Sequence, residues 1–320
     1  MDTIFGVRKI KTNLARPVIT LGVFDGVHLG HQKVIKKIVS LAKRKNGESI
    51  VLTFDRHPGS FLSKKPQTCI TSLEHRLVLF ERLGVDITVV LEFNKKIAET
   101  GAEDFITEII YNWLGAKVVV LGFNCSFGKD RRGNASMVCD FAHKYGFEVI
   151  SCEAARLEDE IISSTTIREN IIQGNLQKAK GMLGRCVSVF GTVIKGSGRG
   201  RGLGFPTANL NLHHEIKPPS GVYATRVLFD GREYHAITNI GKRPTFDENT
   251  HNNDTLVEVH IVEVHIIDFN ESIYDRDLEV QFLYKMREET KFENADELKQ
   301  QLERDKMRFI KRSGKKVLTE

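Results

Sequence analysis

Cysteines, long apolar runs and an apolar N-terminal core are scarce or absent in this sequence of 320 residues. The five cysteines are odd in number and lack metal-ligand spacing, which predicts reduced thiols in a cytoplasmic protein and no zinc site. No run of about 18 apolar residues occurs, and no signal-peptide core is visible. These absences argue against a disulfide-built secreted domain and give no support to export or membrane spanning.

The composition that remains is that of an ordinary globular protein, with 41% hydrophobic and 28% charged residues. The length exceeds the usual size of one domain, so two domains with separate cores are expected. The net charge of +6 would suit an anionic partner, but the basic residues are scattered, apart from a cluster in 311–316. Phosphorylated small molecules would serve as that anion as well as a nucleic acid would.

In the first half, short apolar runs alternate with amphipathic helical patterns. The runs predicted to be buried strands are 18–24, 49–54, 87–93 and 117–123. This alternation predicts an α/β domain with a parallel sheet wrapped by helices. Because ligands of such sheets bind outside the carboxyl ends of the strands, the loops that start at Gly22, Asp55 and Gly122 should face one crevice.

After Leu183 the pattern changes to β-branched or alternating strands separated by Gly, Pro and Asn turns. It predicts a compact antiparallel barrel or sandwich, followed by one amphipathic helix from about Ala295 to Phe309. The predicted domains are therefore 1–183 and 184–320. Within the second, the pentapeptide VEVHI occurs twice in succession; an odd shift sends the two copies to opposite faces of a strand unless a bulge intervenes.

The stretch GVFDGVHLGHQ places His28 and His31 one turn apart where a strand gives way to a helix. Unpaired amide groups and the helix dipole make such an end a phosphate site, to which imidazoles can add hydrogen bonds. Two histidines here could instead merely cap or pack. Asp25, Gly26 and Gly30 at fixed offsets favour the phosphate site, and Gly30 would let a ligand approach the backbone.

This stretch resembles the nucleotidyltransferase motif of the prokaryotic bifunctional riboflavin kinase/FAD synthetase family, and ISSTTIREN resembles that family's distal phosphate motif. The resemblance implies a Rossmann-like nucleotidyltransferase domain, in which His28 and His31 hold the α-phosphate of ATP and Arg168 contacts the triphosphate. The ATP-binding residues implied in this half are Gly22, Phe24, Asp25, Gly26, Gly30, Ser164 and Thr165. Ser164 and Thr165 could also act as ordinary helix caps.

The segment LGFNCSFGKDRRGN resembles the family's flavin-side loop, which implies that Asn124 and Phe127 bind the isoalloxazine ring. Cys125 stands where the family more often has an aromatic residue, a departure that could expose a thiol. His57, in TFDRHP, matches loosely as a further flavin-binding residue, but it could equally be a turn residue before proline.

The stretch GSGRGRGLGFPTANL ends in what closely resembles the riboflavin kinase signature. The resemblance implies ATP binding by Gly196, Arg201, Gly204, Pro206 and Thr207, and binding of nucleotide-bound Mg²⁺ by Thr207 and Asn209. Side chains two apart on a strand project to one face, and a hydroxyl with an amide oxygen suits a hard cation. Read alone, the glycine and arginine run could be a flexible loop or a nucleic-acid contact.

The resemblance also implies a glutamate base on the strand that follows the RPTF element, where the duplicated pentapeptide offers Glu258 and Glu263. Counting forward from RPTF favours Glu258, whereas counting back from IIDF favours Glu263. Glu263 is preferred because loops vary more readily than strand registers. Arg287 and Phe292 would touch flavin or help to close the site, although Arg287 could simply pair with nearby acids.

The implied reactions are riboflavin phosphorylation to FMN in the C-terminal barrel and FMN adenylylation to FAD in the N-terminal domain. The implied partners are ATP, riboflavin and FMN, with Mg²⁺ carried by ATP; neither nucleic acid nor membrane is implied, and the oligomeric state is open. One alternative is that only one activity is retained. Another is a flavin-responsive regulator or nucleic-acid binder, although the sequence has no aromatic-rich RNA-binding strand.

Overall fold

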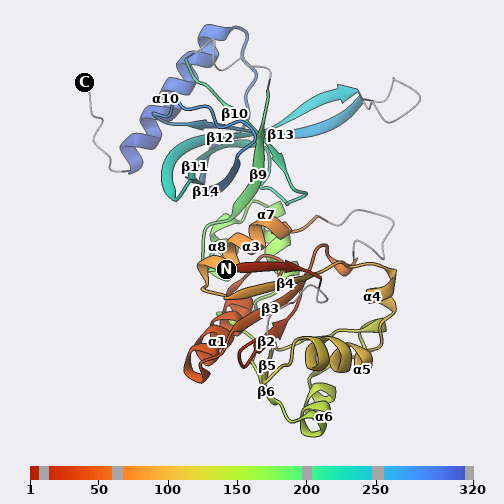
Figure 1. Ribbon diagram of the computed structural model, residues 1–320. Helices are drawn as coiled ribbons and strands as arrows, with labels where there is room; N and C mark the ends of the chain where they lie inside the picture. The colour runs from red at the N-terminus through yellow and green to blue at the C-terminus, as the bar shows by residue number, and fades with distance from the viewer. Residues whose placement is uncertain (7–13, 60–67, 197–203, 247–255, 314–320) are drawn as a thin grey trace. The chain divides into compact units, whose positions relative to one another are not determined.

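The computed structural model describes residues 1–6, 14–59, 68–196, 204–246 and 256–313 (Figure 1). It divides into two compact units: Met1–Arg168 with Gly181–Gly184, and Glu169–Lys180 with Arg185–Glu320. Each has its own sheet and core, so the two are described separately. Over the described ranges, no helix combines the length and the apolar character needed to cross a membrane.

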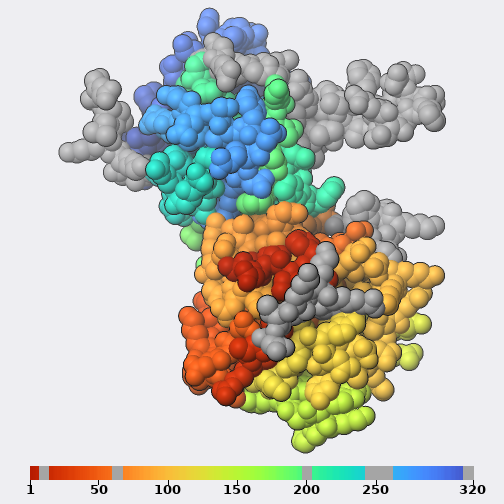
Figure 2. Space-filling view, viewed as in Figure 1, coloured from red at the N-terminus to blue at the C-terminus, as the bar shows by residue number. Residues whose placement is uncertain are grey.

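The first unit is built on a parallel six-stranded sheet in the order β1-β4-β3-β2-β5-β6. Its strands are β1 (Asp2–Phe5), β2 (Val18–Leu21), β3 (Ser49–Phe54), β4 (Ile87–Leu91), β5 (Val118–Leu121) and β6 (Glu148–Ser151). The four strands predicted from apolar runs lie inside this sheet, and they are mostly apolar because they are buried on both faces. The edge strands β1 and β6 are partly exposed; β1 appears in red on the surface in Figure 2.

The strand order fixes where a ligand can enter. From β2 the chain proceeds to β3 and β4 on one side and later to β5 and β6 on the other. Loops leaving the carboxyl ends of β2 and β5 therefore diverge to opposite faces, and this leaves a crevice at the topological switch point. The predicted Rossmann-like arrangement is confirmed.

Helices and short elements connect these strands or follow the last of them. They are α1 (Leu29–Lys45), α3 (Leu73–Arg82), α4 (Lys95–Glu99), α5 (Ala102–Asp104), the π-helix η2 (Phe105–Trp113), the 3₁₀ turn η3 (Lys129–Arg131), α6 (Ala135–Tyr145), the hairpin β7 (Arg156–Leu157) and β8 (Glu160–Ile161), α7 (Ser164–Ile172) and α8 (Leu176–Leu183). The hairpin β7–β8 and the helices α7 and α8 follow β6, and residues 169–180 of the last two helices belong to the second unit. Helix α1 packs its buried face on β2, β3 and β5, and basic residues in its last turn complement the helix dipole. Its first turn is thereby aimed at the switch point.

The second unit is a closed antiparallel barrel in the order β10-β13-β12-β11-β14-β9, as the strand pattern predicts. Its strands are β9 (Ser188–Ile194), β10 (Ala208–Leu212), β11 (Gly221–Phe229), β12 (Arg232–Phe246), β13 (Leu256–Ile266) and β14 (Asp277–Arg287). Helix α10 (Ala295–Ser313) lies along the outside, where Phe309 packs in a cluster with residues such as Val222 and Ile237 (Figure 1). The predicted terminal helix is confirmed and extends four residues further.

Both copies of the repeated pentapeptide lie on the single strand β13. The β12–β13 register runs without a shift from the pair Ala236 and Ile266 to the pair Phe246 and Leu256. No bulge therefore separates the copies, and equivalent positions such as Glu258 and Glu263 alternate between the two faces of the sheet.

Candidate active sites

A cavity of about 360 Å³ lies at the switch point of the parallel sheet. Loops after β2, β3, β5 and β6 and the start of α7 line it. The residues predicted from sequence that line it are Gly22, Phe24, Asp25, His28, Gly30, His31, His57, Asn124, Ser164 and Thr165. Three predicted residues of this half, Gly26, Phe127 and Arg168, do not line the cavity. Segments more than a hundred residues apart thus meet at one site.

His28 caps helix α1. Its Nδ1 accepts a hydrogen bond from the amide of His31 at 3.4 Å, so the proton of a neutral ring lies on Nε2. The two imidazoles stack with centroids 3.6 Å apart, and Phe24 meets the edge of the His31 ring. A Cβ at Gly30 would lie 3.1 Å from the His28 ring. Gly30 therefore makes room for the His28 imidazole; it also lines the cavity, and the approach of a ligand to its backbone stays a prediction.

The loop that precedes α1 is held in an unusual backbone conformation. Phe24, Gly26 and Val27 all have positive φ, at 55°, 82° and 39°. Only glycine adopts positive φ angles readily, so the backbones of Phe24 and Val27 are strained. The contacts around the loop must stabilise this conformation. The Gly26 amide donates to Thr71 Oγ1 at 2.7 Å. Gly26 thus shapes the loop and does not line the cavity.

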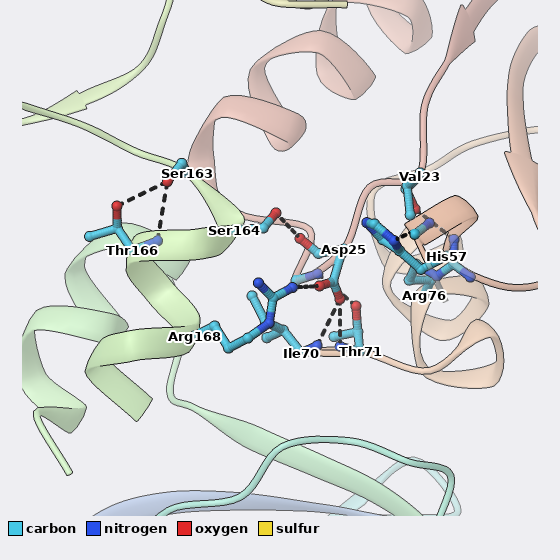
Figure 3. A network of polar contacts seen from close by, with 12 residues as sticks. Val23, Asp25, His57, Ile70, Thr71, Arg76, Ser163, Ser164, Thr166 and Arg168 are labelled. Carbon is cyan, nitrogen blue, oxygen red and sulfur yellow. Dashed lines mark hydrogen bonds and ion pairs between the residues drawn. The ribbon is translucent and has the colours of Figure 1, made fainter. Parts of the chain in front are cut away.

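Asp25 fastens this loop to α7 (Figure 3). One carboxylate oxygen accepts hydrogen bonds from the amides of Ile70 and Thr71 at 2.8 and 3.0 Å, and the other pairs with Arg168 at 2.8 Å. Its carbonyl oxygen accepts a hydrogen bond from Ser164 Oγ at 2.9 Å. Asp25 is 4% exposed, so this ion pair is well shielded from water. Arg168 is therefore held by Asp25, which precedes His28 by three residues in the sequence.

Arg76 holds the same loop through hydrogen bonds, and it belongs to none of the sequence motifs. Its guanidinium donates to the carbonyl of Val23 at 2.6 Å (Figure 3). It also donates to Thr53 Oγ1 at 2.9 Å and to the carbonyl of Phe54 at 2.9 Å. It thereby joins the ends of β2 and β3. Burial, together with the charges of Arg168, Arg76 and Arg131, lowers the pKa of His57, which favours its neutral form.

The flavin-side loop differs from the sequence-based prediction. Phe127 is 6% exposed and packs on Phe105 in the core, so it does not reach the cavity. Phe123, 62% exposed, is the aromatic side chain of this loop that lines the cavity with Asn124. Cys125 packs against the core, and burial raises the pKa of its thiol to about 11. The thiol is therefore protonated at neutral pH and forms an apolar wall.

In the barrel, one cross-strand row gathers the predicted kinase residues. Asn209 on β10 lies directly opposite Glu263 on β13, and Glu263 lies opposite Asn239 on β12. The row continues through Val222 on β11 to Arg287 on β14. Directly opposed residues share a face with Cβ atoms about 5 Å apart, so the Asn209 amide and the Glu263 carboxylate are neighbours.

Asn239 is a member of this row that the sequence analysis did not single out. Its Nδ2 donates to Glu289 at 3.4 Å, and within the described residues its buried Oδ1 has no hydrogen-bond partner. Glu258 lies opposite Pro244 instead, five residues and about 17 Å from Glu263 along the strand.

The glycine-rich loop lies only partly within the described residues. Arg201 falls outside them. Gly204 has a φ of 82°, and a Cβ at Gly196 would overlap the Asn209 amide. The carbonyl of Pro206 lies 2.9 Å from Nδ1 of His265, which fixes the chain just before Thr207. Among the described residues, no group of three or more His, Cys, Asp or Glu side chains could hold a metal ion.

Arg287 forms an ion pair with helix α10. It binds Asp305 of α10 through Nε at 3.0 Å and through Nη2 at 2.9 Å, and Asp305 is 3% exposed. Its guanidinium also lies 5.8 Å from the Phe292 ring centroid. The two residues predicted to bind flavin therefore touch each other, while the charge of Arg287 is neutralised by α10.

Arg287→Ala is expected to destabilise the barrel by about 2–3 kcal/mol, because it leaves the buried Asp305 carboxylate without its cation. Hydrogen exchange of peptides from β14 and α10 measures this, since the single tryptophan, Trp113, reports on the other unit. Arg276→Ala is the control, because its pair with Asp230 is exposed and should change stability by less than about 1 kcal/mol. Equal protection in the two variants would contradict a structural role.

Comparison with known proteins agrees with the two units. A family model described as FAD synthetase matches residues 10–166, and one described as riboflavin kinase matches residues 183–312. Two proteins described as bifunctional riboflavin kinase/FMN adenylyltransferase are each 36% identical to this chain. The Haemophilus influenzae protein covers 95% of the chain and 97% of its own length, and the Bacillus subtilis protein covers 94% of each. The Escherichia coli protein of the same description is 32% identical over 91% of the chain and 90% of its own length.

A crystal structure from Streptococcus pneumoniae, described as a macrolide-efflux protein, is 32% identical to this chain with a TM-score of 0.79. The match covers 96% of this chain and 98% of that one, so the fold is shared over nearly the whole length; the efflux description is that protein's own. The matches to both family models and the identity over most of each relative's length lead to one conclusion. The chain belongs to the bifunctional riboflavin kinase/FMN adenylyltransferase family.

Proposed function

We propose that the domain of residues 184–320 phosphorylates riboflavin to FMN with ATP, and that the domain of residues 1–183 transfers the adenylyl group of a second ATP to FMN, giving FAD and pyrophosphate. The observation that carries this proposal is the convergence of the histidine pair and the start of α7 on one cavity, while the Asn209–Glu263 pair lies on a separate barrel. Each domain would therefore hold its own ATP.

In adenylyl transfer, an oxygen of the FMN phosphate attacks the α-phosphorus of ATP, and the bond to the pyrophosphate oxygen breaks. His28 would donate its Nε2–H to an α-phosphate oxygen, because its Nδ1 is occupied by the His31 amide. The amides at the N-terminus of α1 face the same charge, which such helix ends favour. The residues supply alignment and positive potential and form no covalent bond.

Arg168 does not line the cavity, so its positive charge would stabilise the departing pyrophosphate from beside the lining residues while it stays paired with Asp25. A guanidinium has five N–H donors, and the ion pair with Asp25 uses one at 2.8 Å. The pair holds the side chain at a fixed position beside the loop that carries His28. Ser164 and Thr165 line the cavity and would contact the β- and γ-phosphates from the start of α7.

In the kinase reaction, Glu263 would take the proton of the riboflavin 5′-hydroxyl as its oxygen attacks the γ-phosphorus. Its position directly opposite Asn209 supports Glu263 over Glu258 as this base. The oxygens of Thr207 and Asn209 fit a hard cation, and Mg²⁺ bound with ATP would neutralise phosphate charge there. Gly204 would let the phosphates approach the backbone, since its conformation excludes a side chain.

Chromatography of the flavins formed from riboflavin, MgATP and the purified full chain tests this function. We expect FMN to appear first and FAD to follow, with ADP and pyrophosphate as the respective co-products. Starting from FMN, only FAD and pyrophosphate should form. Accumulation of FMN without FAD, or FAD formation only from added FMN, would show that a single activity is retained; no turnover of either flavin would overturn the proposal.

A further inference from the structure

The nucleophile of adenylyl transfer is itself an anion, so it needs a cation on its own side of the cavity. Among the described residues that line the cavity, Arg131 is the one arginine or lysine. The lining carboxylates are those of Asp25 and Glu153, and Arg168, which neutralises Asp25, lies outside the lining. The lining histidines can lose their proton near neutral pH, whereas an arginine keeps its charge. Arg131 therefore contributes the fixed positive charge of the lining.

The side chain of Arg131 is oriented by contacts within its loop. Its Nε donates to Ser126 Oγ at 2.9 Å, and Ser126 lines the same cavity. This bond uses one guanidinium donor and leaves the four N–H groups of the two Nη atoms for other partners. A planar pair of Nη donors matches two oxygens of a phosphate group.

The backbone that carries Arg131 is strained. Asp130 and Arg131 adopt left-handed φ angles of 53° and 57° in succession, in a 3₁₀ turn whose N-cap is Gly128. Non-glycine residues in this region cost about 1–3 kcal/mol each, and such strain persists where the surroundings enforce it. At Gly128, a Cβ would lie 2.7 Å from the Ala102 backbone, so this loop is pressed against α5. The strained turn directs a charged side chain to the cavity.

We propose that Arg131 binds the terminal phosphate of FMN and thereby selects FMN over riboflavin as the acceptor of the adenylyl group. The inference rests on the proposed adenylyltransferase function of this cavity. Phe123, Asn124 and Arg131 line the same cavity as the histidine pair, so a flavin that stacks on Phe123 would present its phosphate to Arg131. ATP carries the same chemical group, so the experiment separates the two phosphate sources.

The test is the steady-state formation of FAD from FMN and ATP by the full-length Arg131→Ala variant. We expect the KM for FMN to rise at least tenfold and the KM for ATP to change less than twofold. Lumiflavin, which has no ribityl phosphate and cannot be phosphorylated, should inhibit competitively against FMN with an unchanged Ki. This last result is one that a collapsed flavin site would not give. Arg131→Lys should recover part of the affinity for FMN.

Arg132→Ala is the matched control, because Arg132 is also exposed and adjacent but does not line the cavity. Its KM values should stay within twofold of wild type. A KM for FMN that is unchanged in Arg131→Ala overturns the inference, and so does a rise in the KM for ATP alone. A raised Ki for lumiflavin also overturns it, since the substitution would then have disturbed the flavin site itself. Failure of the wild-type protein to form FAD would instead refute the proposed function itself.

Discussion

His28→Ala is expected to lower FAD formation from FMN by about 10²–10³-fold while riboflavin phosphorylation stays within twofold of wild type. The imidazole donates to charge that develops at the α-phosphorus, and loss of one such donor typically has this effect on kcat. The barrel does not use this residue. Separate assays of FMN and FAD formation by chromatography measure the two activities.

Two further variants separate catalysis from folding. His28 also caps α1, and loss of a cap costs about 1 kcal/mol of stability. His28→Asn restores a side-chain acceptor at the cap without an imidazole, so it should recover stability but not FAD synthesis. His143→Ala removes an exposed histidine of α6 in the same unit and should change neither activity. FAD synthesis that survives in His28→Asn would contradict the proposed phosphate contact.

Asn209→Ala is expected to lower riboflavin phosphorylation by about 10²-fold or more and to leave FAD formation from FMN within twofold. The amide oxygen would hold the cation that accompanies ATP, and its Cβ lies about 5 Å from that of Glu263. Asn211→Ala is the matched control, since Asn211 lies two residues further along the same strand and opposes Thr192 on β9. Equal loss in both variants would point to damage to the strand.

The same assay decides between the two glutamates. Glu263→Gln should abolish phosphorylation to a similar extent, because glutamine cannot accept the proton of the riboflavin hydroxyl. Glu258→Gln should retain activity, because the register places Glu258 about 17 Å along β13. The opposite result would move the base to the other copy of the pentapeptide.

Much of the fold was predictable because its determinants are local. Strands β2 to β5 are short and mostly apolar runs without polar alternation, and such runs indicate strands buried on both faces whatever the partner. His28 was predictable because the cap, the glycines and the histidine pair all lie within one short stretch. The edge strands β1 and β6 were missed, since their half-exposed sequences carry no comparable pattern.

The features that could not be predicted from the sequence depend on contacts between distant segments. Whether Phe123 or Phe127 faces the cavity follows from the packing of Phe127 on Phe105, which no local pattern reveals. Arg76 belongs to no motif, and its role appears only when α3 meets the ends of β2 and β3. The choice of Glu263 similarly needed the register across three strands of the barrel.

The most direct test of the central claim, two separate ATP sites on one chain, is complementation between variants. His28→Ala with riboflavin and MgATP should accumulate FMN, and Asn209→Ala should leave riboflavin unchanged, so neither alone yields FAD. When the two proteins are mixed, FMN released by the first should reach the intact cavity of the second, and FAD should form at a rate set by both concentrations. A mixture that makes no FAD, although each protein keeps its remaining activity, would contradict the account.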